Sequence, residues 1–314
     1  MKIGLGLFVY NRPHHTKQVL EGLKRNNIDK LYIFCDGPKP GEDTENIDQT
    51  RDLVKSIDWC DTKIVMQEYN LGLVANTVSG IYTMLEENDA AVVLEDDCVP
   101  RSDFWYYMST CLRNYQHSDK VMHVNGYQLP IKIRRSSRYD VFFTALPQSW
   151  GCGVWKRSWQ YFRMDISDAA DYFKRPESTR LTSLCPLIED GIQRVIRGDI
   201  SSWVYRWYYL INLNKGFCVA PYKSLIRNIG HDGTGVHCGE SNIYNIDDTE
   251  WNKELFTNKK LKLPEKIFRD KYMDAQTPHF YGKIRRVDRV KDRLKAMFWR
   301  PLPEYFKATI RRFW

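Results

Sequence analysis

The sequence predicts an α/β fold in which helices flank a mostly parallel β-sheet. Along the first third of the chain, short apolar runs without helical spacing alternate with segments whose apolar residues recur every three or four positions. Such alternation is typical of strands and helices joined as βαβ units. The chain has 314 residues, of which 43% are apolar and 27% charged, so it can bury a core on both faces of a sheet.

Each of the first four predicted strands is followed by turn residues and then by a helix. The strands are expected at 2–10, 31–36, 62–67 and 90–96, and the helices begin at Pro13, near Ile47, near Asn70 and at Ser102. Because parallel strands end at the same edge of a sheet, we expect ligands at their carboxyl ends.

The second half of the chain has a less regular pattern. It predicts strands over 121–124, 141–144 and 217–220, helices over 181–197 and 203–213, and a flexible loop over 228–239, where four of twelve residues are glycine. We expect one domain over residues 1–255, with halves that meet at residue 125, and a helical extension over 256–314.

The cysteine pattern and the hydropathy of the chain indicate the cellular compartment in which the protein is expected. The eight cysteines are scattered without a C-x-x-C pair, which favours buried free thiols over disulfides. No stretch is apolar over the roughly 20 residues that a bilayer requires. No signal-peptide pattern follows Met1. The sequence therefore predicts a cytoplasmic protein without disulfides.

The formal charge of +8 is concentrated in the tail over 283–314, which has eleven Lys or Arg residues and three Asp or Glu residues. The residues before it are neutral overall. Apolar residues at helical spacing on both sides of Pro301 and Pro303 predict two short basic amphipathic helices, which suit an anionic membrane surface. Alternatively, these helices pack on the domain with a solvated basic face. A neutral domain disfavours a nucleic-acid partner.

Three carboxylates, Glu95, Asp96 and Asp97, directly follow the apolar residues 92–94. Burying them unpaired would be costly. Because side chains alternate along a strand, Glu95 and Asp97 are expected on one side, where they form an oxygen site suited to Mg²⁺ or Mn²⁺. Such a metal neutralises a departing diphosphate. Taken alone, the triplet would equally fit a solvated strand end or a helix N-cap.

The segment VVLEDDCVPRSDFWYY is the most specific motif, and VYNRP, FCDGP, NLGLVANTVSGI, SWGCGVW and NIGHDGTGVH accompany it in order. With these segments, about residues 1–240 resemble the GT-A nucleotide-sugar glycosyltransferases. The chain is similar in particular to the branch with an acidic E-D-D motif, which includes the mannoside β-1,2-N-acetylglucosaminyltransferase and related bacterial glycosyltransferases. The resemblance implies a Rossmann-like GT-A domain with a nucleotide-binding half, 1–125, and an acceptor half, 126–255.

The resemblance also implies roles for individual residues. Arg12 and Asp36 would hold the nucleotide base, Asp96 would face the ribose and Asp97 would ligate the metal, while the nucleoside side would be lined by Asn70, Gly72 and Asn76. On their own, these residues have simpler interpretations. Asp36 would cap the turn at Gly37, and Arg12 would be a surface residue.

Two further segments gain roles from the resemblance. His237 matches a late histidine that acts on the metal or the diphosphate from a loop that closes over the donor, with His231 as a weaker competitor. Trp150, Gly151 and Trp155 of SWGCGVW match the segment beneath the donor sugar and acceptor. The simpler interpretation of that segment is a buried aromatic turn.

An inverting transferase needs a carboxylate base for the acceptor hydroxyl. Related bacterial sequences would place it in a W-D-x-x-W arrangement, but this chain has Val204 at that position. We assign the base to Asp199, with Glu189 and Asp190 as substitutes, although each of these residues also fits a helix surface or cap. Absence of a base would instead indicate a retaining or non-catalytic relative.

Three function classes are compatible with these features. The first is a glycosyltransferase that uses Mn²⁺ or Mg²⁺ and a UDP-linked donor, acts on a saccharide or lipid-linked acceptor in cell-surface glycan synthesis, and attaches peripherally to the membrane. A nucleotidyltransferase would place a Gly-rich loop after the first strand, where this chain has the residues 10–13, YNRP. A nucleotide-binding protein with a nucleic-acid-binding tail is the third. The sequence favours the first.

Overall fold

The computed structural model describes residues 1–133, 138–234 and 260–283, together with residues 244, 246, 251, 255 and 256. His237 and the basic tail after Lys283 lie outside the described residues, so the predictions made for them stay predictions. No helix within the described part of the chain is long and apolar enough to cross a membrane.

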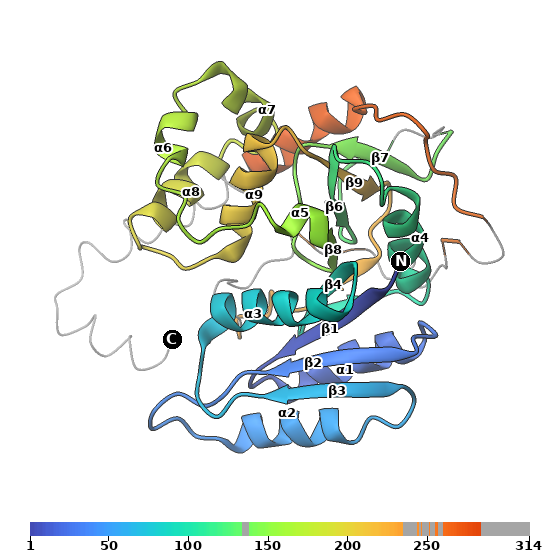
Figure 1. The fold of residues 1–314 in the computed structure, drawn as a ribbon, viewed down its shortest axis with the longest axis vertical. Helices are drawn as coiled ribbons and strands as arrows, with labels where there is room; N and C mark the ends of the chain where they lie inside the picture. The colour runs from blue at the N-terminus through green and yellow to red at the C-terminus, as the bar shows by residue number, and fades with distance from the viewer. Residues whose placement is uncertain are drawn as a thin grey trace, which may run out of the picture.

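A mixed sheet of eight strands forms the centre of the fold, as Figure 1 shows, with strand order β3-β2-β1-β4-β8-β6-β9-β7. The first four strands of this order are parallel, and β8 continues the sheet antiparallel to β4. The strands are β1 (Ile3–Val9), β2 (Lys30–Cys35), β3 (Asp61–Met66), β4 (Ala90–Glu95), β6 (Val121–Asn125), β7 (Val141–Thr144), β8 (Cys152–Trp155) and β9 (Phe217–Pro221). A separate two-stranded ribbon pairs β5 (Cys98–Pro100) with β10 (Ile226–Asn228).

Helices cover both faces of the sheet. They are α1 (Pro13–Lys24), α2 (Glu45–Lys55), α3 (Gly72–Glu87), α4 (Phe104–Asn114), α5 (Lys156–Trp159), α6 (Ala169–Tyr172), α7 (Thr179–Thr182), α8 (Ile188–Ile196) and α9 (Trp203–Leu213), with a 3₁₀ turn at Pro176–Ser178 and a helical stretch over 271–283. Apolar residues of α1, α2 and α4 belong to one core cluster, and those of α3, α8 and α9 belong to the cluster on the other face.

The alternation of side chains along β1 explains how one strand supports two cores. Leu5, Leu7 and Val9 belong to the cluster with α1, whereas Phe8 belongs to the cluster with α3 and stacks on Phe34 of β2. A strand that is buried on both faces has an almost continuous apolar sequence. The predicted α/β class with a mostly parallel sheet is therefore confirmed.

Two element predictions need correction. The segment over 181–197 is not one helix, because α7 ends at Thr182 and α8 begins at Ile188. Pro186 lies between them, and proline lacks the amide hydrogen and the space that a helix interior requires. Residues 152–155, for which a buried aromatic turn was the simpler interpretation, form strand β8 between β4 and β6.

The cysteine prediction is confirmed for the described part of the chain. Seven cysteines there are free thiols, and all but Cys60 are buried. Cys238 lies outside the described residues.

Two polar side chains of β6 fix the loop that precedes β8. His123 Nε2 lies 3.0 Å from the Gln148 carbonyl oxygen, and its Nδ1 lies 3.1 Å from the Trp207 indole nitrogen. An indole N–H can only donate, so Nδ1 accepts and Nε2 carries the proton. Asn125 adds bonds to Leu146 O and Gln148 N at 3.2 and 3.0 Å. The neutral form of His123 is therefore the one that fits.

Burial lowers the pKa of His123 from 6.5 to about 4. As the pH falls from about 6.5 towards 4, this histidine is protonated in the unfolded chain but stays neutral in the folded chain. The free energy of unfolding therefore decreases by up to about 3 kcal/mol. The His123→Gln variant removes the titrating group, so its unfolding free energy should change between pH 7 and pH 5 by about 2 kcal/mol less than that of wild type. Urea unfolding at both pH values measures this. An identical pH dependence in the two proteins would contradict the assignment.

Candidate functional site

The site lies at the carboxyl ends of three neighbouring parallel strands. Arg12 follows β1 and Asp36 follows β2, while Glu95 ends β4 and is continued by Asp96 and Asp97. Residues more than 80 positions apart in the sequence therefore lie at one sheet edge. The structure thus brings together Arg12 and the acidic triplet.

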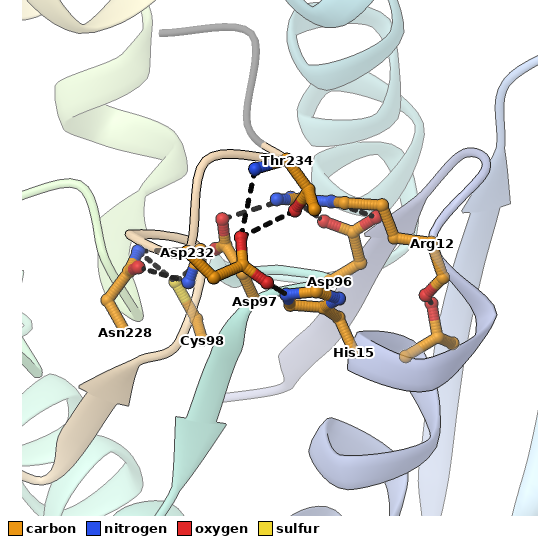
Figure 2. A network of polar contacts seen from close by, with 10 residues as sticks. Arg12, His15, Asp96, Asp97, Cys98, Asn228, Asp232 and Thr234 are labelled. Atoms are coloured by element: carbon orange, nitrogen blue, oxygen red, sulfur yellow. Dashed lines mark hydrogen bonds and ion pairs between the residues drawn. The ribbon is translucent and has the colours of Figure 1, made fainter. Parts of the chain in front are cut away.

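Arg12 clamps two of these carboxylates, as Figure 2 shows. Its Nε and Nη2 atoms donate to the two oxygens of Asp96, and Nη2 also donates to Asp97 Oδ2 at 2.9 Å. The side chain of Arg12 is 19% exposed, and its buried Nη1 has no hydrogen-bond partner among the described residues. Arg12 therefore acts as a counter-ion here rather than as a surface residue.

Fully ionised, the acidic triplet would carry more negative charge than one guanidinium can balance. Burial, together with the charges of Asp97 and Asp96, raises the pKa of Glu95 to about 8. Burial also raises the pKa of Asp96, although Arg12 opposes that effect. The site consequently favours an additional cation.

The β5–β10 ribbon brings a late segment of the chain to Asp97. Cys98 pairs with Asn228 across this ribbon, and the Asn228 amide donates to Asp97 Oδ1 at 3.2 Å. The backbone N–H of Ile229 donates to the Asp97 carbonyl at 2.9 Å. Asp97 is thereby held from both sides, by Arg12 and by Asn228.

Residues 230–234 pass directly over the carboxylates. A Cβ added to Gly230 would lie 2.1 Å from Asp97 Oδ2, so only glycine allows the backbone to come this close. Asp232 then pairs with His15 of α1 at 3.0 Å and also accepts a hydrogen bond from the Thr234 hydroxyl (Figure 2). The segment is therefore tied to α1 on one side and to Asp97 on the other.

Trp150 borders the same segment. Its ring makes edge contacts with His231 and Tyr244, each with centroids 5.3 Å apart, and with Tyr127 at 4.6 Å. His231 directly follows Gly230, whose backbone covers Asp97. Trp150 therefore contacts the residue next to this covering backbone. Gly151 next to it adopts φ +62°. Trp155 is different, because it pairs with Ala90 at the opposite end of β4 and is buried with its indole bound to Leu112 O.

Asp36 forms a separate junction with the N-terminus of α3. Its carboxylate accepts hydrogen bonds from the backbone amides of Gly37, Leu71 and Gly72 and from the Asn70 side chain, at 2.8–3.2 Å. These contacts match the turn-capping interpretation. The role of Asp36, Asn70 and Gly72 in binding a nucleotide stays a prediction.

Asn76 lies on α3, one turn after Gly72, and is buried. Its amide nitrogen contacts the Phe34 carbonyl at 3.5 Å, and its Oδ1 has no hydrogen-bond partner among the described residues. It therefore faces β2, at the strand end that also carries Asp36.

The candidate bases lie on a different element. Glu189 and Asp190 are exposed in the first turn of α8, and Asp199 is exposed after that helix, where it pairs with Arg197 at 2.9 Å. Within the described residues, no hydrogen bond or ion pair connects these three carboxylates to the acidic triplet. Their assignment as a base stays a prediction.

The donor atoms at the end of β4 fit a divalent cation. Glu95, Asp97 and Cys98 each offer one ligand atom, and these atoms lie within 4.8 Å of one another. The two carboxylates supply the oxygen ligands, whereas the Cys98 thiol, whose pKa burial raises well above its usual value, donates to Asp97 Oδ1. Oxygen ligands suit Mg²⁺ and Mn²⁺.

The sequence patterns do not indicate three residues of this site: His15, Asn228 and Asp232. In the segment over 228–239, these patterns point only to the glycines and histidines. Asn228 and Asp232 belong to that segment, but only the pairing of β10 with β5 brings them near Asp97 and α1.

No protein-family model matches the chain, and no curated protein matches it either. Solved structures with a similar fold include S. aureus TarS 1–349 (11% identity, TM-score 0.43, covering 72% of this chain and 60% of that chain). Others are the mannosyltransferase PcManGT from Pyrobaculum calidifontis in complex with GDP-Man and Mn²⁺ (10%, 0.39, 67% and 68%) and GalNAc-T7 with UDP, GalNAc and Mn²⁺ (8%, 0.46, 77% and 47%). The chain thus spans 60% of the TarS chain. These likenesses concern the chain fold alone.

Proposed function

We propose that the protein is a metal-dependent, inverting glycosyltransferase that moves a hexosyl or N-acetylhexosaminyl group from a nucleotide-diphosphate donor, with UDP as the expected nucleotide. The acceptor would be a saccharide or a lipid-linked saccharide in cell-surface glycan synthesis. Among GT-A enzymes, we place it with the E-D-D branch that includes the mannoside β-1,2-N-acetylglucosaminyltransferase.

One observation carries the proposal. Glu95 and Asp97 present oxygen ligands at the carboxyl end of β4, next to the ends of β1 and β2, where α/β sheets bind ligands. Arg12 is the ion-pair partner of the buried Asp96 and Asp97, and Glu95 has no ion pair with it, so a divalent cation would complete the charge balance of the three carboxylates. A diphosphate is the leaving group that such a cation would neutralise.

The surrounding residues would divide the remaining tasks. Mn²⁺ or Mg²⁺ held by Asp97 and Glu95 would stabilise the negative charge of the departing nucleotide diphosphate. Asn228 orients the Asp97 carboxylate, Arg12 binds Asp96, and the segment over 228–234 covers Asp97. Trp150 lies beside this segment, in contact with His231, and is only partly buried, so its aromatic ring is the group we assign to the sugar. His237 would approach the diphosphate or the metal from the loop that follows.

A second candidate function has some support. Asp199, Glu189 and Asp190 are all exposed, and the chain has Val204 where a base was expected. These features also fit a retaining or non-catalytic relative that binds the nucleotide without an inverting base.

We further propose that the tail over 283–314 attaches the protein to the cytoplasmic face of an anionic membrane, where a lipid-linked acceptor would be located. The support is the tail's net charge of +8 and its apolar residues at helical spacing.

Asp97→Ala should fold but lose Mn²⁺-dependent binding of UDP, and any transfer activity should fall by about 10²-fold or more, because the diphosphate charge is no longer neutralised. Isothermal calorimetry with UDP, with and without Mn²⁺, measures the loss. Asp171→Ala serves as a control, since that aspartate is exposed and pairs with Lys174. Unchanged Mn²⁺-coupled UDP binding in Asp97→Ala would remove Asp97 from the site.

Asp199→Asn should leave donor affinity nearly unchanged and lower transfer to the acceptor by about 10²-fold or more, the usual contribution of a general base. Kinetics with a soluble acceptor, measured in parallel for Glu189→Gln and Asp190→Asn, compare the three candidates. Full activity of Asp199→Asn would move the assignment to whichever of the other two variants is impaired. Full activity in all three would favour the retaining or non-catalytic alternative.

Deletion of Lys283–Trp314 should abolish co-sedimentation with anionic liposomes and leave activity on a soluble acceptor intact. Added salt should weaken attachment of the full-length chain, because exposed charges are screened beyond about 8 Å at physiological ionic strength. If the tail instead packs on the domain, the deletion should lower the melting temperature and reduce all activities together. Unchanged co-sedimentation would refute the membrane role.

A further inference from the structure

Both oxygens of Asp97 are engaged by groups of the chain itself. Oδ2 accepts the Arg12 Nη2 hydrogen at 2.9 Å, and Oδ1 accepts from Asn228 at 3.2 Å and from the Cys98 thiol at 3.4 Å. Asn228 and Cys98 are neutral contacts that a metal-bound carboxylate tolerates. Arg12 brings a positive charge to one of the two Asp97 oxygens, and a second cation on the same carboxylate would be repelled by it in this partly buried site.

Arg12 does not depend on Asp97 for its place in the site. Its Nε and Nη2 atoms form a two-point fork with Asp96, whose side chain is 8% exposed. The guanidinium can therefore leave Asp97 and stay bound to Asp96. Its Nη1 atom, which has no hydrogen-bond partner among the described residues, adds an unused donor.

We propose that Arg12 is the resident counter-ion of Asp97, and that a divalent cation displaces it from that carboxylate and leaves it on Asp96 to receive the diphosphate of the donor. This inference rests on the proposed function, because it concerns the cation and the donor of that reaction. Guanidinium groups bind phosphate oxygens well, so the displaced donors gain a partner when the nucleotide arrives. Cation and nucleotide binding are then coupled, each strengthening the other.

Displacement of Arg12 by the cation predicts a result that differs from the one expected if Arg12 only holds the nucleotide base. When a binding-competent state is only partly populated, its apparent affinity is reduced by that fraction. Removing the competing guanidinium should therefore tighten binding of the cation alone. We expect Arg12→Gln to bind Mn²⁺ about tenfold or more tightly than wild type in the absence of nucleotide. An arginine that only holds the base would leave Mn²⁺ affinity unchanged.

The experiment titrates MnCl₂ into the full-length protein and follows free Mn²⁺ by its electron paramagnetic resonance signal. Arg157→Gln is the matched control. Its guanidinium is also partly buried but donates to the backbone carbonyls of Gln116, Tyr115 and Val121 rather than to carboxylates. That variant should bind Mn²⁺ as wild type does. The double variant Arg12→Gln, Asp97→Asn should lose the tight binding, which assigns it to Asp97.

Thermal unfolding gives a second measurement. Without metal, Arg12→Gln should melt at a lower temperature than wild type because Asp96 and Asp97 lose their partner. Mn²⁺ should raise the melting temperature of this variant more than that of wild type. If Arg12→Gln does not fold, Arg12→Lys replaces it, since one ammonium cannot bind both carboxylates as a fork and should give an intermediate Mn²⁺ affinity.

The outcomes separate this inference from the proposed function. Mn²⁺ affinity that is unchanged or weaker in the Arg12 variants, with Asp97-dependent Mn²⁺ binding in wild type, would overturn the displacement and leave the proposed function standing. A loss of UDP affinity alone would return Arg12 to the base-binding role. Absence of Mn²⁺ binding in wild type and in both Arg12 variants would overturn the inference together with the metal dependence.

Discussion

The ion pair between Arg12 and the aspartates after β4 is the contact around which the sheet edge is organised. Val92, Val93 and Leu94 require full burial, and the same strand then delivers three carboxylates into a region with little water. Charges in such a region must be compensated. Arg12 can do so only because β1 lies beside β4 in the sheet and ends at the same edge. The charge balance of the acidic residues therefore depends on the order of β1 and β4 in the sheet.

The second half of the chain completes what the first half begins. The sheet β3-β2-β1-β4 places Arg12, Asp36 and the acidic triplet, but it leaves Asp97 without a partner on its other side. The β5–β10 ribbon supplies Asn228 and lays residues 230–234 across the carboxylates. His231 of the same segment contacts Trp150. One short stretch of backbone therefore covers the carboxylates and also contacts the aromatic side chain beside them.

The sequence predicted the first half of the fold well because fully buried parallel strands have nearly continuous apolar sequences. It was less accurate where neighbours decide the structure. Residues 152–155 are Cys, Gly, Val and Trp, a run too short to indicate a strand, and they form one because β4 and β6 offer edges on both sides. In the site, Asp97 and Arg12 were found from motifs. Asn228 contacts Asp97 across 131 positions, a distance over which no local pattern carries information.

The β5–β10 pairing also determines when the site comes into existence. The strands β1, β2 and β3 pair in chain order, and β4 then returns to pair with β1 across more than 80 positions, so all four strands of this half are complete once Glu95 has been added. The Asn228–Asp97 contact must instead close a loop of 131 residues. During synthesis, the parallel strands leave the ribosome long before Asn228 does. The acidic cluster therefore passes through a period in which Arg12 is in place but the covering backbone has yet to be translated.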